Sequence, residues 1–445
     1  MKIPRQILLV IFVISVTLSS FFAAFSHPVV QDDDSGQYDT IGWNIAQGRG
    51  FSLAQTEPFT PTMLREPLYP CFLAIVYKIF GHDYRAAIAF QIIFFALTCL
   101  AVYFIAKEIF DKRIAAYSAI LTALCPTLAN YPSYILTETT FTLLLCIFIF
   151  VSIKAVRYGK NALFIASGAI LGICALCKAI MLPFSLIVTL FILLRRGMRQ
   201  AALFIIIFML MVSPWFFRNY TLFGTFQPSL RGGAALWERA QKSDDTIEDM
   251  KHAVVFNFSE YLGNKMFPGL VENPQDYILL GSKKSHDKEK ELSEQGLTPT
   301  EIDKSMREEA KKNILAHPIK FLIYIPIESI KMTAFIYLPI LNEPDLINRF
   351  SDLKNGNAML SAIRSVFRLS AYPILLLVLI GIYYKRKEWK NWILMVGLII
   401  YINTIYSMIF ALGRYAVPIV PFYLIFAVTG LSCLFAGRSK INDRL

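Results

Sequence analysis

Long apolar runs alternate with short polar connections along this chain of 445 residues. A helix of about 20 apolar residues crosses the ~30 Å hydrocarbon core of a bilayer. The pattern therefore predicts an all-α polytopic membrane protein with about ten transmembrane helices. We expect these spans at residues 7–25, 86–106, up to 130, 134–153, 162–180, up to 195, 201–217, 371–384, 392–412 and 416–435.

Composition and charge support this class and set the orientation. The chain is 56% hydrophobic and 17% charged, whereas soluble domains carry about 25% charged residues. The net charge of +12 could indicate nucleic acid binding, but Lys and Arg cluster in short connections such as 107–113, 154–160, 195–199 and 385–390. Positive connections face the cytoplasm. We therefore expect no nucleic acid partner and a location in the plasma (inner) membrane, in contact with membrane lipid.

Two polar segments divide the chain. We expect an N-terminal transmembrane module, 1–217, whose first outer loop is 27–70; an outer, mainly helical region with an interfacial helix, 218–340; and C-terminal spans with a cytoplasmic tail, 341–445. In the outer region, Thr298, Pro299 and Glu301 predict a capped helix that runs to about Ala316. A crossing at 321–340 would carry the basic residues 385–387 outside, so we expect a helix or a helix pair with both ends outside, with Glu328 and Lys331 incompletely buried.

The first outer loop combines acidic and basic residues. Asp34, at the end of the triplet 32–34, is a good N-cap, with Gln37 in a capping-box position. The apolar spacing that starts at Tyr38 predicts an amphipathic helix at the membrane surface, with its acidic end facing water. Arg65 comes just before a second apolar helix at 68–80. The loop therefore brings an acid and a base to one membrane face.

Asp34 is the candidate catalytic group of this loop. Capping lowers the pKa of a carboxylate and adjacent carboxylates raise it, so Asp34 could be ionised and still accept a proton from a hydroxyl. The alternative interpretation is a helix cap with a topogenic acidic patch. Asp32, Asp33 and Asp34 could also bind a divalent cation, although no complete ligand set stands out. We expect no required cofactor, no assigned metal ligands, and a divalent cation as an open alternative.

Basic residues on the outer side of the membrane run against the topology rule. Together they could hold an anion at the outer leaflet, such as a lipid phosphate, because the planar fork of arginine donates two parallel hydrogen bonds. Snorkelling at the interface is the alternative for each one. Glu138 lies just inside the fourth span, where it either binds a substrate hydroxyl or pairs with a basic residue. The outer basic residues are Arg65, Lys178, Arg218, Arg231 and Arg414.

With these elements in order, the chain resembles the GT-C superfamily of membrane glycosyltransferases, in its branch of protein mannosyltransferases and lipid A aminoarabinose transferases. The resemblance covers most of the chain, although Glu66 stands where the family often has a second Pro. It rests on Asp34-Ser-Gly-Gln-Tyr38, Gly48-Arg-Gly50-Phe51, Arg65-Glu66-Pro67-Leu68-Tyr69-Pro70, Thr137-Glu138, Lys178, Pro214-Trp215-Phe-Phe-Arg218-Asn219-Tyr220 and Arg414-Tyr415.

The resemblance implies transfer of a sugar from a polyprenyl-phosphate carrier to a lipid, polysaccharide or protein acceptor outside the membrane, with inversion at the anomeric carbon. Asp34 would be the catalytic carboxylate, and Arg65, Arg218 and Arg414 would bind the donor phosphate. Tyr38, Tyr69, Glu138, Lys178 and Arg231 are further candidates for the substrate site.

Two other functions fit the same pattern. A transporter or flippase of a lipid-linked sugar predicts ionisable residues deep in the spans and repeat-related broken helices, and the sequence shows few of the former and none of the latter. A non-catalytic envelope-assembly protein on the same scaffold would tolerate the loss of Asp34.

Overall fold

The structure, a computed structural model, describes residues 5–26, 34–267, 274–336, 338–342, 346–347, 350, 353 and 356–442. Within these residues the chain is helical, and its extended pairing is limited to an isolated bridge between Ser52 and Pro61. The predicted all-α class is confirmed.

The helices follow one another with short connections. Their bounds are α1 (Arg5–Ala23), α2 (Asp34–Ala46), α3 (Leu68–Phe80), α4 (Tyr84–Ile109), α5 (Lys112–Ala123), α6 (Pro126–Asn130), η1 (Tyr131–Ser133), α7 (Glu138–Tyr158), α8 (Asn161–Cys177), α9 (Met181–Arg196), α10 (Met198–Phe223), α11 (Gly232–Gln241), η2 (Lys242–Asp244), α12 (Ile247–Phe258), α13 (Glu260–Met266), α14 (Pro274–Glu294), α15 (Pro299–Ala316), α16 (Pro318–Thr333), η3 (Pro339–Asn342), α18 (Gly356–Tyr384), η4 (Arg386–Glu388), α19 (Trp389–Ile409), η5 (Gly413–Ile419) and α20 (Val420–Asn442).

The long apolar helices make the protein a multi-pass membrane protein. Seven helices of the described chain are long and apolar enough to cross a bilayer, or eight if the bent pair of α5 with residues 126–133 counts as one span. α8 and α9 are shorter, at 17 and 16 residues. Every predicted span corresponds to a helix: α1, α4, α5 with α6, α7 to α10, and α18 to α20.

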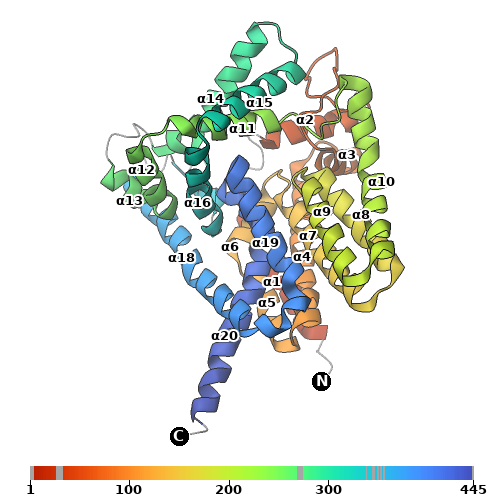
Figure 1. Ribbon diagram of the computed structural model, residues 1–445, viewed down its shortest axis with the longest axis vertical. Coiled ribbons are helices and arrows are strands. Elements are labelled where there is room, and N and C mark those ends of the chain that lie inside the picture. Colours follow the sequence, from red (N-terminus) through yellow and green to blue (C-terminus); the bar gives the residue numbers. More distant parts are fainter. Residues whose placement is uncertain are drawn as a thin grey trace.

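The polar helices gather at one end of the molecule. In Figure 1, α2, α11, α14 and α15 lie together above the bundle of long helices, whereas the start of α1 and the end of α20 lie at the opposite end. The ion pairs described below lie in the region where the polar helices meet the bundle.

Small residues let the long helices approach closely. A Cβ atom on Gly381 of α18 would lie 2.3 Å from the carbonyl oxygen of Phe426, and one on Gly430 of α20 would lie 2.1 Å from that of Leu377. Only glycine fits at both positions, so the two backbones pack directly on each other, as is common between membrane helices.

Two predicted outer helices form where the sequence places them. α3 spans Leu68–Phe80, and α15 begins with a complete capping box in which Thr298 and Glu301 exchange hydrogen bonds with each other's backbone. The predicted incomplete burial of α16 is wrong at Glu328, which is 1% exposed. Lys242 and Lys331 compensate its burial, with Nζ atoms 2.7 Å and 3.0 Å from the carboxylate.

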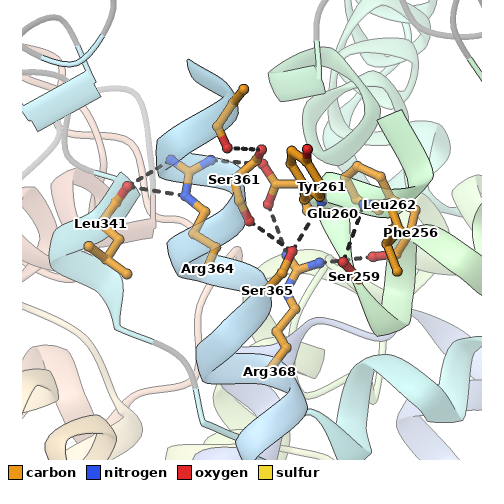
Figure 2. A network of polar contacts seen from close by, with 11 residues as sticks. Phe256, Ser259, Glu260, Tyr261, Leu262, Leu341, Ser361, Arg364, Ser365 and Arg368 are labelled. Atoms are coloured by element: carbon orange, nitrogen blue, oxygen red, sulfur yellow. Dashed lines mark hydrogen bonds and ion pairs between the residues drawn. The ribbon is translucent and has the colours of Figure 1, made fainter. Parts of the chain in front are cut away.

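One buried ion network joins the outer helices to a span (Figure 2). Glu260 of α13 is 2% exposed and lies between two arginines of α18, with its oxygens 3.0 Å from Arg364 Nη1 and 3.5 Å from Arg368 Nη2. Arg364 also donates to the carbonyl of Leu341, and Arg368 to that of Phe256. The carboxylate therefore joins α13 to one face of α18, and Arg364 holds Leu341 at the same face.

Removing Glu260 should destabilise the fold. Glu260→Ala leaves two largely buried guanidinium groups without their counter-ion, which costs about 3–5 kcal/mol. We expect a clearly lower melting temperature for the purified protein in detergent. Glu308→Ala, at a carboxylate whose side chain is 59% exposed, is the matched control and should melt like the parent protein. Equal melting temperatures for both variants would contradict the structural role of Glu260.

Candidate active site

The first residue of α2 joins three distant parts of the chain. One oxygen of the Asp34 carboxylate accepts a hydrogen bond from Arg65 Nη2, and the other accepts one from Arg414 Nη2. Arg231 Nη2 lies 3.8 Å from the first oxygen. Arg65 precedes α3, Arg231 precedes α11, and Arg414 lies in η5. The first outer loop, the outer region and the last membrane connection thus meet at one carboxylate.

The arginines cover Asp34. Its side chain is 13% exposed, and those of Arg65 and Arg414 are 6% and 20% exposed. The prediction that the acidic end of α2 faces water is therefore wrong for Asp34, because guanidinium groups occupy the place of solvent. Asp32 and Asp33, the other two acidic residues of the triplet, lie outside the described residues.

The arginines also control the charge of Asp34. Burial raises the pKa of this carboxyl, but Arg414, Arg65 and Arg231 together hold it well below its usual range. The carboxyl group is therefore ionised at neutral pH. A carboxylate stabilised in this way is a weak proton acceptor until some of the positive charge is drawn away.

Tyrosines and an amide fix the orientation of Arg65. Its Nε donates to Gln37 Oε1 at 2.8 Å, and its guanidinium carbon lies 4.9 Å from the centre of the Tyr38 ring. The Tyr38 ring meets the Tyr69 ring edge-on at 5.1 Å, and the Tyr69 hydroxyl donates to Gln91 Oε1 at 2.9 Å. Tyr38 and Gln37 therefore hold Arg65 directly, and Tyr69 supports the ring of Tyr38.

A second ion pair adjoins the first. Lys178 Nζ lies 3.1 Å from Glu138 Oε1, and Glu138 is 2% exposed. Of the two roles expected for Glu138, the structure shows the ion pair. Lys178 Nζ also lies 5.3 Å from the ring centre of Tyr415, the residue after Arg414, and that ring stacks on Tyr406 at 4.3 Å.

Arg218 lies apart from this cluster. Its Nη1 donates to the Thr62 carbonyl at 2.8 Å, and its guanidinium carbon lies 4.7 Å from the ring centre of Trp215 and 5.3 Å from that of Phe51. The structure gives it no ion pair with a carboxylate of the described chain. Arg218 therefore fastens the loop before Arg65 to the end of α10.

Glu66 was not predicted as a site residue. Its Oε1 accepts hydrogen bonds from Ser229 Oγ at 3.1 Å and from the Ala179 backbone N–H at 3.4 Å. It thus ties the Arg65 loop to the start of α9 and to the segment before Arg231. Its place beside Arg65, where related sequences often have Pro, was the available signal.

The side chains that surround the Asp34 carboxylate are cationic. In the described chain, no group of three or more His, Cys, Asp or Glu side chains could hold a metal ion. The positive charge that faces Asp34 comes from three guanidinium groups.

Part of the chain matches a known protein family by sequence. Residues 61–217 match the family model of dolichyl-phosphate-mannose-protein mannosyltransferase. No protein with a curated description matches the chain by sequence.

Solved structures match nearly the whole chain. The oligosaccharyltransferase AglB from Archaeoglobus fulgidus, in complex with an inhibitory peptide and a dolichol-phosphate, aligns with a TM-score of 0.54 and 13% identity over 100% of this chain and 52% of AglB. The Archaeoglobus fulgidus oligosaccharyltransferase in complex with Zn and sulfate aligns with a TM-score of 0.53 and 14% identity, over 97% of this chain and 49% of that protein. ArnT from Cupriavidus metallidurans, bound to undecaprenyl phosphate, aligns with a TM-score of 0.43 and 14% identity, over 96% of this chain and 77% of ArnT.

The chain spans about half of the length of AglB (52%), so the likeness concerns the fold of that part. The fold of the superfamily predicted from the motifs is confirmed. This protein has the fold of the GT-C membrane glycosyltransferases, and its residues 61–217 match the protein mannosyltransferase family.

Proposed function

We propose that this protein is a membrane glycosyltransferase that moves a sugar from a polyprenyl-phosphate carrier to an acceptor hydroxyl, with inversion at the anomeric carbon. The observation that carries the proposal is the single ionised carboxylate, Asp34, that three arginines from three segments enclose. The fold of AglB, whose structure holds a dolichol-phosphate, and the match to a dolichyl-phosphate-mannose family support the same chemistry.

The arginines suit a phosphate ligand. Three guanidinium groups face the carboxylate of Asp34, so positive charge predominates around it. A sugar phosphodiester carries one negative charge, and the carrier phosphate released from it carries a further one. Arginine forks donate parallel hydrogen bonds to such oxygens, and they stabilise most strongly the charge that develops on the leaving group.

Donor binding would also activate Asp34. A phosphate that draws Arg65 and Arg414 toward itself removes the interactions that hold the pKa of Asp34 low. The carboxylate then becomes a stronger base at the moment when the donor is in place. The free protein keeps Asp34 ionised but inactive, and the loaded protein has it ionised and basic.

The reaction follows from these roles. The acceptor oxygen attacks the anomeric carbon from the face opposite the phosphate, and its proton passes to Asp34. The bond between the anomeric carbon and the phosphate oxygen breaks, and its electron pair stays on that oxygen. The carrier phosphate leaves with its additional charge beside Arg65 and Arg414.

The site would face the extracytoplasmic side. The basic connections expected in the cytoplasm include 385–390, and α2 and α11 lie at the end of the molecule away from the close of α20 (Figure 1). The acceptor, whether lipid, polysaccharide or protein, would approach past the outer helices. Arg231, with 48% of its side chain exposed, is the member of the cluster on that approach.

Asp34→Asn should abolish transfer. The amide keeps the size of the side chain but cannot take a proton, and general bases contribute about 10²- to 10⁴-fold to rates. We expect the purified variant in nanodiscs to consume no polyprenyl-phosphate sugar. Donor consumption is measured by mass spectrometry, with membrane extract as the source of acceptor. Donor binding should be kept or tightened, because Asp34 no longer competes with the phosphate for the arginines.

Asp111→Asn is the matched control. Asp111 is exposed and caps α5 by accepting from the Arg113 and Ile114 backbone N–H groups, and asparagine caps helices as well as aspartate does. Unchanged turnover by Asp34→Asn would refute the catalytic role of Asp34. A carrier that binds but is never consumed by the native protein would favour a transporter or an assembly protein.

Arg65→Ala and Arg414→Ala should weaken donor binding. The loss of a hydrogen bond to a charged group costs about 1.5–3 kcal/mol, so we expect the donor KM to rise roughly 10- to 100-fold. Arg231→Ala should have a smaller effect, because that side chain is half exposed. Arg218→Ala is the comparison: it loses the hydrogen bond to the Thr62 carbonyl but no contact with Asp34, so it should raise the donor KM less than Arg65→Ala or Arg414→Ala does. A larger rise in the donor KM for Arg218→Ala than for Arg65→Ala and Arg414→Ala would indicate that the phosphate binds beside Arg218.

The pH profiles should show the activation of Asp34. In the free protein the pKa of Asp34 lies below its usual value of about 3.9, so kcat/KM for the donor should show no acidic limb from this group above about pH 4. In the loaded protein the pKa is higher, and activity falls as pH drops through it. We therefore expect the acidic limb of kcat at higher pH than that of kcat/KM. Coincident limbs would contradict the activation by donor.

A further inference from the structure

A second carboxylate on α2 is buried without a cationic partner from Arg or Lys in the described chain. Asp39 is 7% exposed, and its Oδ1 lies 2.8 Å from the Tyr77 hydroxyl and 2.8 Å from His82 Nε2. Its Oδ2 accepts a hydrogen bond from the Tyr84 hydroxyl at 3.3 Å. Burial of a carboxylate is costly unless such donors compensate it, so the three donors fix the position of Asp39.

His82 is held by α2 on two sides. It lies in the turn between α3 and α4, and its ring stacks on the Trp43 ring at 4.6 Å with an angle of 7° between the planes. Tyr77 and Tyr84 meet the same ring edge-on, at 4.9 Å and 5.4 Å. Hydrogen bonds and ring contacts together join the middle of α2 to the α3–α4 turn.

Helix geometry relates this tie to Asp34. Asp39 lies five positions after Asp34, which in an α-helix is a rise of about 7.5 Å and a rotation of about 140°. The two carboxylates therefore leave α2 on nearly opposite faces. Asp34 extends toward the arginines, and Asp39 extends toward the α3–α4 turn.

Other contacts make α2 a rigid link between the two carboxylates. A Cβ atom on Gly42 would lie 2.7 Å from the Cβ atom of Leu73, so α2 lies directly on α3. The Asn44 amide donates to the carbonyls of Ser52 and Ala54, each at 2.9 Å. A displacement of α2 at Asp39 would thus be passed on to Asp34.

We propose that Asp39, together with Tyr77 and His82, is a positioning residue that holds Asp34 in register when the donor phosphate draws the arginines away. The inference rests on the proposed role of Asp34. In the free protein the arginines themselves hold Asp34. Once they turn to the phosphate, the tie on the back of α2 keeps the carboxylate at the acceptor hydroxyl.

The first test separates kcat from the donor KM. A misplacement of about 1 Å at a reacting group can cost about 10²-fold in rate, so Asp39→Ala should lower kcat by roughly 10- to 100-fold. The donor KM should change less than kcat, because Arg65 and Arg414 lie on other elements, although Gln37 and Tyr38 of α2 contact Arg65. Asp39→Asn, which keeps an acceptor oxygen for Tyr77, should recover much of the rate. A merely structural role would lower the yield of folded protein without this split.

The second test separates the hydrogen bond of His82 from its ring stacking. His82→Phe keeps the stack on Trp43 and loses the hydrogen bond to Asp39, whereas His82→Gln keeps a donor and loses the stack. We expect His82→Phe and Tyr77→Phe each to lower kcat severalfold, and His82→Gln to have a smaller effect. These milder variants keep the proposal testable should Asp39→Ala fail to fold.

The outcomes distinguish this inference from the proposed function. If Asp34→Asn abolishes transfer but folded Asp39→Ala keeps its kcat, the positioning role is overturned and the function stands. The same holds if His82→Phe and Tyr77→Phe both keep their kcat. If Asp34→Asn still transfers sugar, the proposed function itself fails. A fall in kcat that is matched by a rise in the donor KM would also overturn the inference, because Asp39 would then act through donor binding.

Discussion

The ion cluster around Asp34 is the interaction on which the site depends. Arg65, Arg231 and Arg414 come from three segments far apart in the sequence, and all three reach the carboxylate of Asp34. Taking charges out of water is costly, and their mutual attraction repays that cost only where geometry and further hydrogen bonds are favourable. Such a cluster is poor evidence for stability and good evidence for a ligand that must meet the same charges. A phosphate satisfies the arginines as Asp34 does, so the free protein contains an internal substitute for its proposed donor.

Several polar contacts around the cluster restrict its movement. Gln37 and Tyr38 orient Arg65, and Glu66 ties the Arg65 loop to Ala179 and Ser229. The proposed exchange of Asp34 for a phosphate would therefore take place within a fixed framework of contacts. Because preorganised charge requires little rearrangement during reaction, such a framework would favour the proposed transfer.

Away from the site, the protein uses different means. The spans pack through apolar side chains and through close approaches at Gly381 and Gly430. The outer helices attach through buried charges, namely Glu260 with the arginines of α18 and Glu328 with two lysines. In a bilayer the spans gain little from hydrophobic association, so shape complementarity holds them. The outer helices carry polar faces and need specific ion pairs to dock.

The sequence by itself determined the helical class, the spans and the local ends of helices. Apolar length predicts each span, and the capping residues Thr298 and Glu301 predict the start of α15, because both signals act within one segment. It also singled out Asp34, Arg65 and Arg414 through a family resemblance. Only the tertiary structure decided that Arg414 and Arg231 reach Asp34, that Arg218 does not, that Glu138 pairs with Lys178, and that Asp39 anchors the back of α2. These contacts join residues up to 380 positions apart, and which charge meets which is set by how the helices pack, which no local pattern records.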